Sequence, residues 1–148
     1  VISYNYGYND TEQLNKIFKI SIIFMALCTI ITFMVSILCA GGIVSVFTPA
    51  SSSVYELTVS GFKLFSLCFL FMGFNIFASS MFTAFSNGKT SAMLSFLRTF
   101  VFTILGLVAL PYILGVDGIW LAVPFGEMLS IAVTIICFYS YRRVYNYA

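Results

Sequence analysis

Residues 20–55 of the chain read ISIIFMALCTIITFMVSILCAGGIVSVFTPASSSVY, without one charged side chain. Further uncharged runs extend from Leu64 to Gly88 and from Thr99 to Val116. A helix of about 20 apolar residues is long enough to span the hydrocarbon core of a bilayer. We therefore predict an all-α protein, a polytopic bundle of membrane helices surrounded by lipid.

The composition agrees with this fold class and excludes several functions. Of the 148 residues, 61% are hydrophobic and 8% are charged, whereas soluble domains are about 25% charged. The net charge of +2 is too small to indicate a nucleic-acid partner. The chain has no His, so His-based catalysis and His-based metal sites are impossible within it. We expect no enzyme activity, no catalytic residue, no metal site and no cofactor.

The four cysteines also favour a structural role. All of them lie in apolar runs and none forms a C-x-x-C motif. A cysteine in such surroundings is usually a small packing residue. We therefore expect no disulfide or metal cluster from this set: Cys28, Cys39, Cys68 and Cys137.

Turn signals divide the chain into four predicted spans within one transport domain that covers residues 1–148. The Pro and Ser residues of 48–53 indicate a loop, and Gly88 follows a predicted helix end. The opening residues, VISYNYGYNDTEQLNK, resemble an internal loop, so we expect the chain to be a segment of a longer protein. The predicted spans are 17–46, 56–85, 91–114 and 118–140.

The basic residues predict the orientation in the membrane, because Lys and Arg are enriched in cytoplasmic loops. Lys63 is the one basic residue near the other two connections. We therefore expect both ends of the chain, and the central loop, on the cytoplasmic side of the inner membrane of a bacterium. The six residues on the predicted cytoplasmic side are Lys16, Lys19, Lys89, Arg98, Arg142 and Arg143.

Polar residues recur at helical spacing inside the spans. Asn75, Ser79 and Thr83 follow one another at intervals of four residues, so they share one helix face. They are candidates for lining a substrate or ion cavity, with Asn75 able to donate and accept hydrogen bonds. The alternative is that Ser and Thr only help helices to pack, and that Asn75 only bonds a neighbouring helix. Glu127, Ser130 and Thr134 form a similar face on the fourth span.

Glu127 is the strongest candidate for a functional side chain. At about 1.5 Å per residue it lies roughly 14 Å along its helix from Gly118, near the middle of the membrane. A carboxylate there costs about 2.5–3.5 kcal/mol on insertion scales, so it should face a cavity, pair with a base or relay ions. Lys63 lies at a comparable depth and is a candidate partner, whereas Arg98 should lie nearer the cytoplasm and anchor the span. Alternatively, Glu127 bonds backbone that Pro124 leaves unpaired.

The 17 Phe, nine Tyr and six Met residues make the interior aromatic and flexible. Such side chains suit a pocket for cationic or aromatic ligands. Phe that faces lipid is an alternative explanation.

Three local motifs resemble the multidrug and toxic compound extrusion (MATE) family of transporters. The opening ISYNYG at residues 2–7 is similar to the loop before the family's ninth helix. The segment FTAFSNGKT at 82–90, followed by SFLRT at 95–99, is similar to the junction of helices ten and eleven. GIWLAVP at 118–124 resembles the start of the twelfth helix.

This resemblance implies that the chain covers the last four of twelve helices, with both ends cytoplasmic. It also implies an antiporter that expels small amphipathic or cationic drugs in exchange for Na⁺ or H⁺, working with the N-terminal part of its own chain. Some members carry a cation-binding carboxylate in the tenth helix, where this chain has the uncharged Asn75. The coupling ion would then act on Glu127 or on carboxylates outside the segment.

Three alternatives remain at this point. A lipid-linked oligosaccharide flippase of the same superfamily would need several bases within the membrane, and this chain has few. A structural four-span protein would bury its polar stripes between helices without water. A membrane-embedded enzyme is disfavoured, because paired Asp residues and Ser–His pairs are absent.

Overall fold

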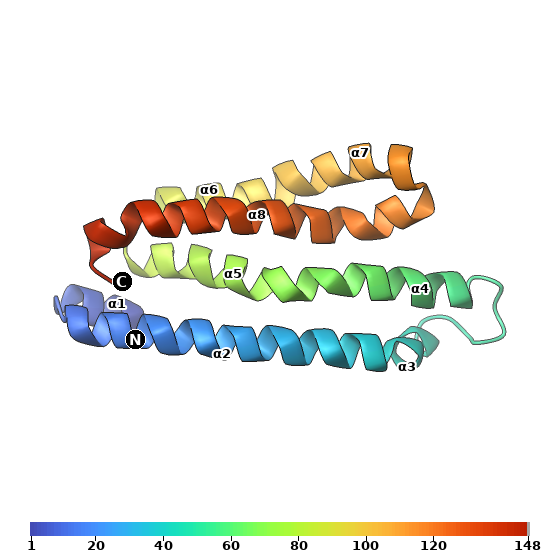
Figure 1. Cartoon of the computed structure of the whole chain (residues 1–148), viewed down its shortest axis with the longest axis horizontal. Coiled ribbons are helices and arrows are strands. Elements are labelled where there is room, and N and C mark those ends of the chain that lie inside the picture. Colours follow the sequence, from blue (N-terminus) through green and yellow to red (C-terminus); the bar gives the residue numbers. More distant parts are fainter. Residues whose placement is uncertain (148) are drawn as a thin grey trace.

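The computed structural model describes residues 1–147, and within that range it contains helices and no strands. Four helical rods are long and apolar enough to cross a membrane, which confirms the predicted four-span, all-α fold. The rods lie side by side along the long axis of the molecule, and both chain ends are found at the same end of the bundle (Figure 1). The rods are Thr11–Leu38, Tyr55–Ala84, Gly88–Leu114 and Val116–Tyr145.

The first rod is helix α2 (Thr11–Leu38), and it starts before the predicted boundary at residue 17. Asp10 sets this start, because its Oδ1 accepts a hydrogen bond of 2.9 Å from the backbone N of Gln13. The helix ends at Leu38 rather than at residue 46, and Gly41 and Gly42 belong to a separate short helix, α3 (Ala40–Ser45). The opening residues also form a short helix, α1 (Ile2–Gly7), where the sequence indicated a loop.

The second rod consists of α4 (Tyr55–Phe65), the 3₁₀ turn η1 (Ser66–Cys68) and α5 (Phe69–Ala84). The turn after it lies where it was predicted, but Gly88 has a different role. Ser86 takes the left-handed conformation with φ of 60°, whereas Gly88 is the first residue of α6 (Gly88–Phe96). Asn87 caps α6, because its Oδ1 accepts a 3.1 Å hydrogen bond from the backbone N of Thr90.

The third rod contains a π-helical segment, η2 (Leu97–Phe102), between α6 and α7 (Thr103–Leu114). The Thr103 Oγ1 donates a 3.0 Å hydrogen bond to the carbonyl of Arg98, five residues earlier. Gly115, with φ of 60°, then makes the tight turn into α8 (Val116–Tyr145), because only glycine adopts this conformation without strain. Helix α8 extends beyond the predicted end at residue 140.

Helices α7 and α8 contact each other through small residues. A Cβ at Gly118 would lie 2.4 Å from the carbonyl oxygen of Leu110, and a Cβ at Gly106 would lie 2.7 Å from that of Ala122. Gly118, Ala122 and Gly126 recur every four residues and are buried. Small residues at this spacing let membrane helices approach closely. These three residues form a small-residue seam that holds α8 against α7 and η2. The seam thereby determines which way Glu127 points.

An aromatic cluster closes the end of the bundle that carries both chain ends. Tyr147 is 1% exposed, and its ring centroid lies 4.9 Å from that of Phe18 and 5.5 Å from that of Phe85. Its hydroxyl donates a 2.7 Å hydrogen bond to the carbonyl of Phe138. Burial raises the pKa of Tyr147 to about 12, so the hydroxyl keeps its proton and its donor role.

We expect Tyr147→Ala to destabilise this end of the bundle by about 3–5 kcal/mol, the range for removing a buried aromatic ring. Tyr147→Phe keeps the ring and loses the hydrogen bond, so it should cost about 1 kcal/mol. Unfolding in detergent, followed by circular dichroism, measures both changes. Tyr112→Ala is the matched control, because Tyr112 is 89% exposed. Equal stability of Tyr147→Ala and Tyr112→Ala would contradict the role of the cluster.

Candidate functional site

A hydrogen-bond network joins α5 to α8 well inside both rods. The Nδ2 of Asn75 donates to the Glu127 Oε2 at 2.7 Å and to the Glu127 carbonyl oxygen at 3.0 Å. The Oγ1 of Thr134 donates to the Oδ1 of Asn75 at 3.0 Å. Asn75 therefore uses both the NH₂ group and the oxygen of its amide. The side chain that bonds Glu127 from another helix is this amide, and not the predicted partner Lys63.

The network is shielded from the surroundings of the chain. Asn75 is 3% exposed and Glu127 is 6% exposed. Ser130, one turn of α8 beyond Glu127, is 3% exposed, and its Oγ has no hydrogen-bond partner among the described residues. Buried polar groups are normally hydrogen-bonded, so this hydroxyl is available to a water, an ion or a rearranged neighbour. The polar residues Glu127, Ser130 and Thr134 of α8 are thus buried inside the bundle.

Local backbone geometry brings a cation towards this network. A Cβ at Gly126 would lie 3.2 Å from the backbone N of Thr103, so α8 passes close to the end of η2. Arg98 lies on η2 and is partly buried, so it belongs to an element that packs against α8 next to Glu127. Short π-helical segments are frequent at functional sites. That Arg98 lies nearer the cytoplasm than Glu127 and anchors the third span stays a prediction.

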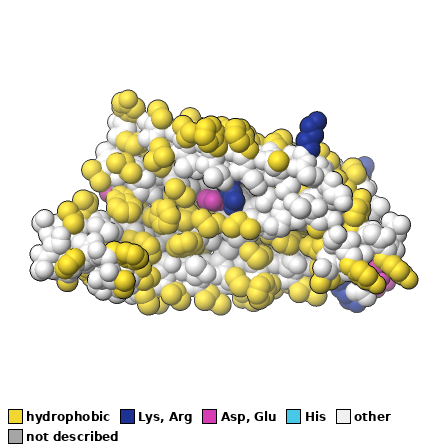
Figure 2. Space-filling view, turned by 180° about the vertical axis from the view of Figure 1, so that it is seen from behind, with side chains coloured by type: hydrophobic (Ala, Val, Ile, Leu, Met, Phe, Trp, Pro, Cys, Tyr) yellow, Lys and Arg dark blue, Asp and Glu magenta, His cyan; other side chains and the backbone are white. Residues whose placement is uncertain are grey.

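Lys63 does not take the partner role that its depth suggested. Its side chain is exposed on α4, whereas the side chain that donates to the Glu127 carboxylate is that of Asn75 on α5. Pro124 is buried in α8, one turn before Glu127, and the carboxylate bonds Asn75 rather than backbone freed by the proline. Figure 2 shows one acidic and one basic side chain close together near the middle of that view, and the other charged side chains lie nearer its edges.

The other two candidates on α5 lie apart from the network. Ser79 is partly buried, and its Oγ donates a 3.1 Å hydrogen bond to the carbonyl of Ile76. Thr83 is exposed, and its Oγ1 lies 2.7 Å from the Oγ of Ser91 on α6. Of the predicted face, Asn75 alone bonds Glu127. The role of Ser79 and Thr83 in lining a cavity stays a prediction.

Two apolar hollows adjoin each other along α5 and α8, since both are lined by Leu70 and Phe71. Pockets for small ligands are typically about 300–1,000 Å³ and mostly apolar. Thr134 belongs both to the network and to the first hollow, so a ligand there would touch the polar site directly. The first hollow, of about 390 Å³, is lined by Ile22, Leu70, Phe71, Phe74, Ile131, Thr134, Ile135 and Phe138. The second, of about 350 Å³, is lined by Leu67, Leu70, Phe71, Leu110, Leu121, Pro124, Phe125 and Met128.

Two contributors to the site were missed by the sequence analysis. Cys68, on η1, is fully buried and lies within the electrostatic influence of Glu127. No pattern in the sequence marks it. The small-residue seam did have a signal, because Gly118, Ala122 and Gly126 continue the four-residue spacing that leads to Ser130 and Thr134.

Comparison with known proteins supports the resemblance in the sequence. A family model described as MatE matches residues 1–108, a range that contains Asn75 and Arg98 and ends before Glu127. Searches of curated proteins and of solved structures gave no match.

Proposed function

This chain belongs to the MatE family of membrane transporters, and we propose that it forms part of an ion-coupled antiporter that expels cationic or amphipathic drugs. It would act together with helices of the N-terminal part of a longer chain, in a bacterial cytoplasmic membrane. The ends that lie together in Figure 1 would face the cytoplasm. The lysines and arginines near those ends favour this orientation.

The observation that carries the proposal is the buried contact between Asn75 and Glu127. An ionisable residue inside a membrane is expensive to keep and usually serves an ion or substrate pathway. Thr134 of the same network also lines the first apolar hollow. The rings of Phe71, Phe74 and Phe138 in that hollow suit a lipophilic cation, because aromatic faces attract cations.

The coupling step that we propose is a change in the charge of Glu127. As a carboxylate, it accepts a hydrogen bond from Asn75 and attracts Arg98 across the contact between α8 and η2. Binding of H⁺ or Na⁺ would neutralise the carboxylate and weaken that attraction. The packing of α8 against η2 would then differ between the ion-bound and ion-free states, as a transporter that alternates its access requires.

Ethidium efflux from cells that express the full-length protein tests this function. Proton and Na⁺ gradients are imposed separately, and cells with an empty vector are the control. Efflux that follows one gradient supports an antiporter and identifies its ion. Absence of efflux under both gradients would contradict drug antiport and favour a lipid-linked flippase of the same superfamily.

Labelling at Ser79 separates a transporter from a purely structural bundle. Ser79→Cys is treated with a water-soluble thiol reagent in the full-length protein, in a background that lacks the exposed Cys39. Ser79 is partly buried, so we expect its labelling to change severalfold when the ion gradient is imposed or collapsed. Thr83→Cys, at an exposed position, serves as the control for reagent access. No labelling at Ser79→Cys in any state would contradict a water-filled pathway along α5.

A further inference from the structure

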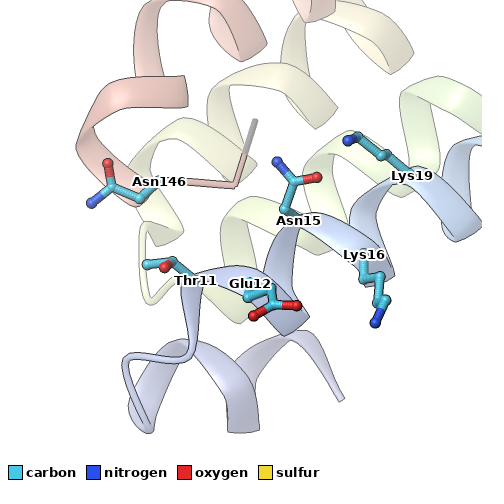
Figure 3. Close-up of a pocket in the computed structure, with 6 residues that line it drawn as sticks. All are labelled: Thr11, Glu12, Asn15, Lys16, Lys19 and Asn146. Carbon is cyan, nitrogen blue, oxygen red and sulfur yellow. The ribbon is translucent and has the colours of Figure 1, made fainter.

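A shallow polar hollow of about 600 Å³ lies at the start of α2, far from the Glu127 network along the bundle. Figure 3 shows side chains from the first turns of α2 on one side of the hollow and Asn146, which follows α8, on the other. The position at the end of a membrane span places the hollow at the level of lipid headgroups. Its lining residues are Thr11, Glu12, Asn15, Lys16, Lys19 and Asn146.

The side chains of the hollow are suited to an anion. Lys16 and Lys19 contribute two ammonium groups, and the amides of Asn15 and Asn146 contribute further N–H donors. Glu12 is the single carboxylate in the lining, so the local charge is positive. Asp10 lies just before the helix and adds a negative charge nearby, but it does not line the hollow, and its carboxylate caps α2 through the backbone N of Gln13.

An exposed apolar surface begins directly below these lysines. The next turns of α2 expose large apolar side chains that no other described helix covers: Ile20 (63% exposed), Ile23 (62%), Phe24 (63%) and Leu27 (56%). Ile20 and Ile23 each follow one of the two lysines by four residues, so charge and apolar stripe share one face of the helix. A molecule with an anionic head and apolar chains would match both parts.

We propose that this hollow, with the α2 stripe below it, is a binding site for an anionic phospholipid. The phosphate would lie against the Lys19 ammonium group and the Asn15 amide, which point to the same side of α2 in Figure 3, and the flexible Lys16 side chain would turn towards it on binding. The acyl chains would run along Ile20, Ile23 and Phe24. Basic pockets at the ends of membrane helices recognise anionic headgroups in this way.

Native mass spectrometry of the full-length protein in detergent tests the site. The probes are phosphatidylglycerol and phosphatidylcholine with identical acyl chains, titrated separately. We expect the wild type to bind phosphatidylglycerol about tenfold more tightly, because each lysine near an anionic lipid strengthens binding. In Lys16→Ala/Lys19→Ala this preference should fall to near parity. Lys63→Ala/Lys89→Ala is the matched control, because it removes two exposed lysines outside the hollow, and it should keep the preference.

Three results would overturn the proposal. The first is an unchanged preference in Lys16→Ala/Lys19→Ala, and the second is an equal loss in the control. The third is displacement of phosphatidylglycerol by inorganic phosphate at similar concentrations. That result would indicate a site for free anions, to which the apolar stripe contributes no binding. Both double variants change exposed or partly exposed side chains, so circular dichroism should show the same helix content as in the wild type.

Discussion

Glu127→Gln is expected to lower ion-driven ethidium efflux by about tenfold or more while leaving the fold intact. Glutamine has the same shape and keeps an oxygen that can accept the 2.7 Å hydrogen bond from Asn75. It is uncharged in every state, so the proposed attraction to Arg98 is lost and ion binding can no longer change it. Loss of a coupling worth about 1.4 kcal/mol corresponds to a factor of ten. Efflux assays at equal protein levels measure the loss.

Two further variants make this prediction specific. Glu56→Gln is the matched control, because Glu56 is exposed in the first turn of α4, and it should leave efflux unchanged. Asn75→Ala removes the donor to Glu127 and the acceptor for Thr134. It should lower both efflux and stability, because two buried polar groups lose a partner at about 1–3 kcal/mol each. Full efflux in Glu127→Gln under either gradient would assign Glu127 a structural role only.

Gly118→Ala is expected to disrupt the contact between α7 and α8 and to destabilise the protein by about 3 kcal/mol or more. The added Cβ would lie 2.4 Å from the carbonyl oxygen of Leu110 and 2.7 Å from the backbone N of Pro111. Both are backbone atoms, so no side chain can rotate out of the way and the helices must separate. Overpacking in a well-packed interior typically costs about 1–3 kcal/mol, and an immovable backbone neighbour places this case at the upper end.

Thermal unfolding of the full-length protein in detergent, monitored by circular dichroism, measures this effect. Gly42→Ala provides the comparison, because nothing lies within 4 Å of its added Cβ and alanine is the better helix former. We expect Gly42→Ala to match or exceed the wild type in stability. If Gly118→Ala unfolds at the same temperature as Gly42→Ala, the seam does not hold α8 in place.

Hydropathy was sufficient to predict the number and type of the spans, whereas their ends depended on short-range chemistry. The first span begins at Thr11 because Asp10 caps it, a polar signal that an apolar run does not contain. The reversal after the second span is centred on Ser86 rather than Gly88. Asn87 can cap α6 only in that arrangement. Such helix ends depend on individual capping hydrogen bonds, and neighbouring residues offer alternative caps of similar free energy.

The position of Glu127 inside the fourth span was predictable from the sequence, but its neighbours were not. Counting residues from Gly118 places Glu127 within the membrane, and helical spacing places Ser130 and Thr134 on its face. The choice of Asn75 and Arg98 over Lys63 depends on how α5 and η2 are rotated against α8. That rotation arises from contacts between elements distant in sequence, such as Gly126 with Thr103. Spacing along one helix carries no information about it.

The π-helical segment η2 gives the third rod a property that a uniform α-helix lacks. A π-helical turn holds about one residue more than an α-helical turn, so this rod contains a spare residue between α6 and α7. If the π-helical turn moved a few positions along the rod, the residues between its old and new places would rotate by about 100° around the helix axis. Both ends of the rod would stay in place. Arg98 lies within the segment, so such a slip would swing its guanidinium away from Glu127. The third rod could therefore turn Arg98 about the helix axis while both ends of the rod stayed in place.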